Sequence, residues 1–104
     1  MDASQVEINS LYALKSGVTA VFIPRVIGKG IRGNTVFQCE VLAHSLPGFS
    51  PDDLYELDPS DREGNIEPLL RKELPLYLGL HVSPAFEDML KGTDKHSLKM
   101  KGSA

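Results

Sequence analysis

The 104-residue chain contains no tryptophan and a single cysteine, Cys39. One cysteine cannot form an intramolecular disulfide, so the disulfide framework that supports many small secreted domains is excluded. Long apolar runs are also missing. The longest one in the first half, residues 18–23, is too short to span a membrane or to serve as the apolar part of a signal peptide. We therefore expect a soluble, cytoplasmic protein that makes no contact with a membrane.

Motifs that carry chemistry are missing as well. The chain has no G-x-S-x-G nucleophile elbow and no cysteine-protease signature. It has four side chains that ligate zinc in other proteins, but no two have the short spacing of a zinc site: Cys39, His44, His81 and His96. We therefore predict a protein that is not an enzyme and that folds without metal or cofactor. Cys39 is predicted to be a small core residue, and His81 a half-buried strand residue.

Charge is unevenly distributed along the chain, whose formal net charge is −3. Residues 1–44 sum to +1, residues 45–90 to −7 and residues 91–104 to +3. Length and composition are typical of one globular domain. The charge pattern therefore predicts an acidic middle between a weakly basic beginning and a clearly basic end.

Residues 18–27 and 35–42 are rich in β-branched and aromatic side chains and flank a glycine-rich segment, a pattern that predicts a β-hairpin. In the second strand, Phe37, Cys39 and Val41 alternate with polar residues, which is typical of a strand with one face in water. Pro24 has no N–H to donate, so the first strand is expected to be an edge or to carry a bulge at that point.

The remaining elements are predicted from helix signals and alternation. Ser4 and Glu7 form a capping-box pattern before apolar residues at helical spacing, which predicts a helix over residues 5–16, with a strand as the alternative. Further elements are expected in four places: short helices over residues 51–57 and 66–74, a strand over residues 76–82, and a helix that starts at Ser83-Pro84 and ends at Gly92. The loop between the two short helices, residues 58–65, is expected to be mobile.

Together these elements predict an α+β fold. Its small antiparallel sheet would have about three strands, namely the hairpin 18–42 and the strand 76–82, with short helices on one face. Residues 1–92 are expected to form a single compact domain, followed by a flexible basic tail over residues 93–104.

Removal of the tail provides a direct test of this domain boundary. Leu98 and Met100 are its only sizeable apolar side chains, so it contributes little buried surface. A chain that ends at Gly92 should unfold within a few degrees of the full chain in a thermal scan followed by circular dichroism. A drop of about 10 °C or more would mean that the tail packs against the domain.

The segment Gly28-Lys29-Gly30-Ile31-Arg32-Gly33 matches the G-x-G-x-x-G pattern of dinucleotide-binding loops. That fingerprint requires a helix after the loop, whereas here a second strand is predicted, so we interpret the glycines as a wide hairpin turn. The alternative is a contact of Arg25, Lys29 and Arg32 with an anion such as a phosphate.

The acidic middle of the chain contains a segment with aromatic and aliphatic residues among its carboxylates, a composition common at interfaces. Its spacing does not match a calcium loop. We predict a partner-binding surface made of Asp52, Asp53, Leu54, Tyr55, Glu56 and Asp58.

The leading functional hypothesis is therefore a small non-catalytic accessory or regulatory protein that binds another protein, such as an inhibitor, adaptor or assembly subunit. Phages and mobile elements encode many proteins of this size. The expected partner has a basic surface. The sequence also leaves open that the protein forms a homo-oligomer. The alternative is a nucleic-acid or phosphate binder that uses the basic hairpin and the lysine tail. Net negative charge makes this alternative less favourable.

Overall fold

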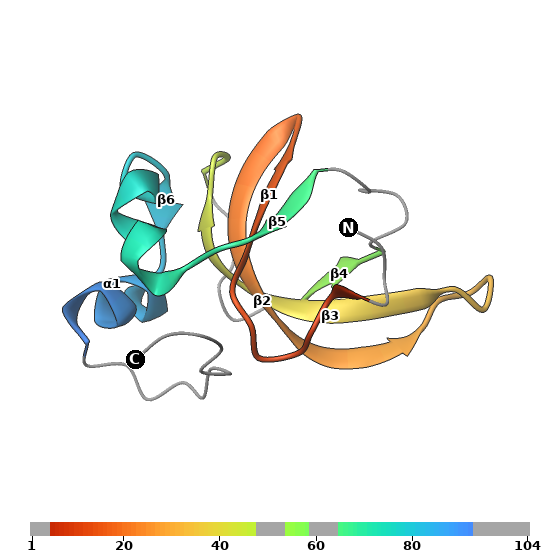
Figure 1. The fold of residues 1–104 in the computed structure, drawn as a ribbon. Helices are drawn as coiled ribbons and strands as arrows, with labels where there is room; N and C mark the ends of the chain where they lie inside the picture. The colour runs from red at the N-terminus through yellow and green to blue at the C-terminus, as the bar shows by residue number, and fades with distance from the viewer. Residues whose placement is uncertain (1–4, 48–53, 59–64, 93–104) are drawn as a thin grey trace.

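The computed structural model describes residues 5–47, 54–58 and 65–92. These residues form an antiparallel sheet, one 3-10 helix (η3) and one α-helix (α1), as Figure 1 shows. In chain order the elements are β1 Tyr12–Ser16, β2 Val18–Lys29, β3 Thr35–His44, β4 Leu54–Leu57, β5 Ile66–Pro68, η3 Arg71–Tyr77, β6 His81–Val82 and α1 Pro84–Lys91.

The six strands are ordered β4-β3-β2-β1-β5, and β6 pairs with the end of β3. Every pairing is antiparallel. The α+β class and the antiparallel sheet agree with the sequence-based expectation, but the prediction of about three strands is wrong. Two of the additional strands, β4 and β5, have four and three residues, which is too short for a sequence pattern to distinguish them from loops.

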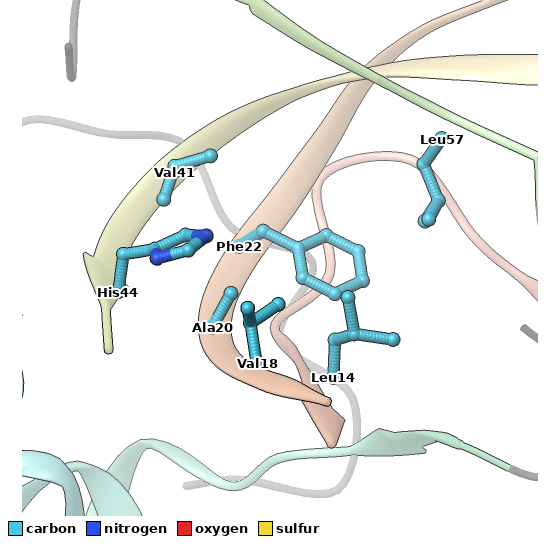
Figure 2. Close-up of a pocket in the computed structure, with 7 residues that line it drawn as sticks. All are labelled: Leu14, Val18, Ala20, Phe22, Val41, His44 and Leu57. Carbon is cyan, nitrogen blue, oxygen red and sulfur yellow. The ribbon is translucent and has the colours of Figure 1, made fainter. Parts of the chain in front are cut away.

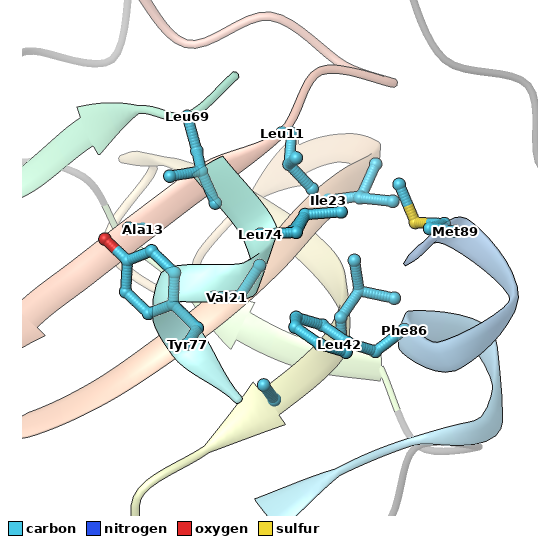
Figure 3. Close-up of a cluster of buried hydrophobic side chains, with 11 residues drawn as sticks. Leu11, Ala13, Val21, Ile23, Leu42, Leu69, Leu74, Tyr77, Phe86 and Met89 are labelled. Carbon is cyan, nitrogen blue, oxygen red and sulfur yellow. The ribbon is translucent and has the colours of Figure 1, made fainter. Parts of the chain in front are cut away.

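One face of the sheet is covered by η3 and α1. Between the sheet and these helices lies a helix-side cluster of buried side chains, shown in Figure 3. It consists of Leu11, Ala13, Val21, Ile23, Leu42, Ala43, Leu69, Leu74, Tyr77, Phe86 and Met89. Its members come from strands and helices that lie far apart in the sequence, so this cluster attaches the C-terminal third of the chain to the sheet.

The opposite face of the sheet has its own buried side chains. This strand-side cluster consists of Val6, Tyr12, Leu14, Ala20, Phe22, Phe37, Cys39, Leu57 and Ile66. Leu57 belongs to β4 and Ile66 to β5, the two outer strands of the sheet order. The sheet therefore curls so that both of its outer strands reach one cluster, and the strong bend of β2 is visible in Figure 1.

The predicted hairpin of β2 and β3 is confirmed, with an irregularity at the predicted place. Pro24 pairs with Cys39 and Val26 pairs with Gln38, so Arg25 is an additional residue in the β2 strand. This is a β-bulge, where a residue without an N–H is tolerated. Both alternatives predicted for Pro24 hold, because the bulge follows it directly and the pairing of β2 with β1 ends at Phe22.

The helix predicted over residues 5–16 is wrong, because residues 6–11 form no helix and β1 begins at Tyr12. Leu11 and Ala13 belong to the helix-side cluster, whereas Tyr12 and Leu14 belong to the strand-side cluster. A strand that is buried on both faces has apolar residues at consecutive positions instead of alternating ones. This loss of alternation made the segment resemble a helix.

The region from residue 54 to residue 82 also differs from the prediction. Residues 54–57 form a strand and not the end of a helix, and residues 51–53 lie outside the described residues. The helix predicted for residues 66–74 is replaced by β5 and the start of η3, and the strand predicted for residues 76–82 is reduced to β6. In η3 the buried residues Leu74 and Tyr77 are three apart, the 3-10 period.

The predicted helix after Ser83 is confirmed as α1. The Ser83 hydroxyl accepts a hydrogen bond from the Phe86 N–H at 3.2 Å, and Gly92 ends the helix with φ 72°. These are the N-cap and left-handed C-cap interactions that the sequence predicts. Neither helix in the described part of the chain is long and apolar enough to cross a membrane.

Candidate protein-interaction surface

The part of the β2–β3 hairpin that comprises residues 25–38 extends away from the helices and is here called the hairpin arm (Figure 1). Three of its aliphatic side chains are exposed: Val26 at 49%, Ile27 at 59% and Ile31 at 107%. Earlier in the same strand, Val21, Phe22 and Ile23 are almost fully buried. The apolar character of β2 thus continues beyond the point where the rest of the protein covers it.

The tip of the arm is a tight turn. The Gly30 N–H donates to the Asn34 carbonyl at 2.8 Å, and the Gly33 N–H donates to the Gly30 carbonyl at 2.9 Å. Gly33 has φ 78°, the conformation that a three-residue hairpin loop requires at this place. A Cβ on Gly30 would lie 2.5 Å from the Asn34 Oδ1 atom. Both glycines are therefore accounted for by the turn, and both of these amides donate within it instead of forming an anion cradle.

The three cations of the alternative anion site have different surroundings. The Arg25 guanidinium lies 3.2 Å from Glu40 Oε1, and its Nη1 atom donates to the Asn9 side chain at 2.8 Å. Because Arg25 is the bulged residue, its side chain is directed toward these neighbours at the base of the arm. Lys29 and Arg32 lie in the exposed end of the arm. The structure thus separates Arg25 from the other two cations.

The acidic segment pairs directly with the arm. Gln38 of β3 is opposite Val26 of β2 on one side and opposite Glu56 of β4 on the other. Residues that pair across strands share a face, so Val26, Gln38 and Glu56 form an exposed row across three strands. Asp58 follows β4 and accepts a hydrogen bond from the Asn34 side chain at the tip. The acidic segment and the basic hairpin, which the sequence offers as alternative binding surfaces, are therefore neighbours in the fold.

The predicted partner-binding residues are only partly described. Asp52 and Asp53 lie outside the described residues. Leu54 and Tyr55 pair in the ladder with Glu40 and Cys39, Glu56 is exposed and Asp58 is half-buried. Leu57 of the same segment is buried in the strand-side cluster and so cannot contact a partner.

Sequence reasoning missed Glu40 as a neighbour of the acidic segment. The alternation in β3 places it on the water-facing side, but only the pairing of β3 with β4 brings it to that segment. We name the exposed or half-exposed residues of this part of the sheet the open face: Val26, Gln38, Glu40, Glu56 and Asp58.

A small pocket lies on the strand-side face of the sheet, and Figure 2 shows its lining side chains. They are Leu14, Val18, Ala20, Phe22, Val41, His44 and Leu57. The space that a water-sized molecule can occupy there is about 20 Å³, close to the minimum for one water. Ligand pockets are many times larger, so this pocket does not fit a substrate or a cofactor.

The structure brings together two of the four zinc-type side chains, because His44 and His81 are directly opposite each other in β3 and β6. The Nδ1 atom of His44 accepts a hydrogen bond from the Leu46 N–H at 3.0 Å, so neutral His44 carries its proton on Nε2. Neither nitrogen then presents a free lone pair to a metal. Within the described ranges, no group of three or more metal-ligand side chains occurs. His81 is exposed and not half-buried as predicted.

Cys39 is fully buried in the strand-side cluster, as predicted for a core residue. Burial raises the pKa of its thiol to about 12, since the charged thiolate is poorly solvated there. A thiol with such a pKa remains protonated at neutral pH, and only the thiolate acts as nucleophile or metal ligand. The arrangement is that of an inert core cysteine.

No protein-family model, curated protein or solved structure matches this chain.

Proposed function

We propose that this chain is a non-catalytic protein-binding module whose contact surface is the hairpin arm together with the acidic open face. The observation that carries the proposal is the exposure of Val26, Ile27 and Ile31 on a projecting element. Exposed aliphatic residues occur singly on most proteins, but a group on one projecting hairpin is typical of an interaction site. A cytoplasmic accessory protein, such as an inhibitor, adaptor or assembly subunit, would use it in this way.

The open face gives the surface its expected selectivity. Glu56 is exposed there, and the Glu40 carboxylate is already paired with Arg25. A partner with basic side chains opposite Glu56 and Asp58 would be steered toward this face. The apolar arm residues would then contribute most of the affinity, because rim charges affect mainly the association rate.

A nucleic-acid or phosphate binder is the second candidate. Lys29 and Arg32 at the exposed end of the arm favour it. Three observations weaken it: Arg25 pairs with Glu40, the amides of Gly30 and Gly33 donate within the turn, and Asp58 lies against the same tip. Binding of a nucleic-acid backbone depends on positive potential concentrated over many cations, and these contacts leave Lys29 and Arg32 as two cations at the tip.

The role of the arm can be tested with one matched pair of variants. Ile31→Asp places a charge at the tip, where no packing is lost because the side chain is fully exposed. Leu76→Asp is the control, since Leu76 is 77% exposed on η3, outside the arm. In affinity capture from a host lysate, Ile31→Asp should reduce recovery of the specific partner at least about tenfold, and Leu76→Asp should leave it unchanged. Equal recovery by both variants would refute the proposal.

Charge reversal distinguishes the two candidate functions. Changing Asp52, Asp53 and Glu56 to lysine should slow association with a protein partner and alter its salt dependence. Changing Lys29 and Arg32 to glutamate should have a smaller effect on this association step, because neither residue belongs to the open face. If instead the glutamate variant alone abolishes binding, and a nucleic-acid probe shows a retardation shift with wild-type protein that disappears with added salt, the nucleic-acid function is correct.

A further inference from the structure

The outer edge of β2 within the arm has no neighbouring strand among the described residues. The pairing of β1 with β2 ends at Tyr12 and Phe22. The Asn9 N–H then donates to the Pro24 carbonyl at 2.7 Å, after which the arm runs on with β3 as its only described neighbour strand. Residues 26–29 are all exposed. One side of this stretch therefore pairs with β3, and its other side is an open sheet edge.

The register determines which backbone groups face this edge. Gly30 and Asn34 form a hydrogen-bonded pair at the tip, and pairs in an antiparallel ladder alternate between hydrogen-bonded and non-hydrogen-bonded. The pairs Gly28–Val36 and Val26–Gln38 are thus hydrogen-bonded. The pairs that Ile27 and Lys29 form with β3 are non-hydrogen-bonded. The N–H and C=O groups of these two residues therefore point away from β3, toward the outer edge.

We propose that this edge binds an extended, acidic segment of another protein, which adds to the sheet as a strand next to β2. The outward backbone groups of Ile27 and Lys29 would supply the hydrogen bonds, as in other cases of strand addition. The exposed Ile27 side chain offers an apolar contact, and Lys29 and Arg32 offer positive charge at the same edge. This inference rests on the proposed protein-binding function and specifies how the arm performs it: one partner would present this acidic strand to the β2 edge and its basic side chains to Glu56 and Asp58 across β3.

Charge decides between an acidic partner and a second copy of the chain. Two arms placed edge to edge would bring together Lys29 and Arg32 of both copies, with like charges close to one another in a narrow ribbon. Lysine on an edge strand is a known means of preventing self-pairing. Gly28 and the bulge at Arg25 add twist that has the same effect. The edge is therefore unfavourable for self-association and favourable for a strand with carboxylates.

Proline substitutions test the geometry, because proline removes one N–H. Ile27→Pro removes an N–H that points outward, so the β2–β3 ladder remains intact. Gly28→Pro removes an N–H that donates to β3, so this variant is the control for the assigned register. We expect Ile27→Pro to unfold within a few degrees of wild type and Gly28→Pro to unfold at a clearly lower temperature. If Ile27→Pro is the more damaging variant, the assigned edge is wrong.

Binding is measured with a defined probe, the peptide acetyl-EVEVEVE-amide, and with acetyl-KVKVKVK-amide as its charge control. In a titration followed by amide NMR, the acidic peptide should shift the Ile27 and Lys29 amides and protect them from hydrogen exchange. Ile27→Pro should weaken this binding at least about tenfold. Lys29→Glu should reverse the preference between the two peptides.

Several results would overturn strand addition at this edge: no binding of the acidic peptide at millimolar concentration, binding that Ile27→Pro leaves unchanged, or protection of these amides that depends on protein concentration without peptide. The last result would mean that a second copy occupies the edge. If Ile27→Pro still captures the partner that Ile31→Asp loses, the protein-binding function stands and strand addition fails.

Discussion

Replacement of Phe86 by alanine should lower the free energy of unfolding by about 3–5 kcal/mol, the usual cost of removing a buried phenylalanine. Phe86 is fully buried in the helix-side cluster, and Figure 3 shows it directed from α1 into that cluster. A helix of eight residues is not stable in isolation. Packing of Phe86 and Met89 therefore holds α1 on the sheet, and the variant should lose helical signal before the sheet unfolds.

Urea unfolding followed by circular dichroism measures this change. Glu87→Ala is the matched control, because Glu87 is the next residue of the same helix and is exposed. It should cost no more than about 1 kcal/mol. A loss below about 1 kcal/mol for Phe86→Ala would contradict the packing of α1 described above.

The thiol of Cys39 should react with a thiol reagent about a thousandfold more slowly in the folded protein than in the unfolded chain. Burial raises its pKa from 9.0 to about 12, so the folded protein holds about a thousandfold less thiolate at pH 8, and only the thiolate reacts. Steric protection by the strand-side cluster adds to this effect. The rate of labelling with iodoacetamide, with and without denaturant, is the measurement.

The same pKa shift predicts how stability depends on pH. Because the folded protein favours the protonated thiol, the contribution of Cys39 is fully present below pH 9 and is lost as the pH rises toward 12. A Cys39→Ala variant should therefore lose less stability than the wild type between pH 9 and pH 11, after its lower starting stability is taken into account. Rapid labelling of the folded wild type at pH 8, or identical alkaline profiles for both proteins, would show that the thiol is accessible to water.

Some elements of the fold were predictable because their signals are local. The turn at Gly33 and the two caps of α1 each depend on residues within a few positions of one another. The β2–β3 hairpin was recognised for the same reason, and so was the bulge next to Pro24. The candidate cations at the arm tip, Lys29 and Arg32, follow from this hairpin.

Other elements were mispredicted because non-local contacts determine them. β1 pairs with β5, although more than 40 residues separate them in the sequence, and β4, β5 and β6 are too short to have a reliable pattern of their own. Exposed Leu76 and Leu78 suggested a strand by their alternation, whereas the burial of Leu74 and Tyr77 places this segment in a 3-10 helix.

The sequence by itself determined the hairpin, the helix caps, the absence of a disulfide and the uneven charge, since each depends on residue type and near neighbours. Only the tertiary structure decided that the acidic segment pairs with the arm, that Arg25 is neutralised by Glu40, and that no described strand pairs with the outer edge of β2 in the arm. These features arise when strands distant in sequence pair and bury both faces of the sheet. Burial is a property of the assembled fold, and no window of consecutive residues contains the partners that produce it.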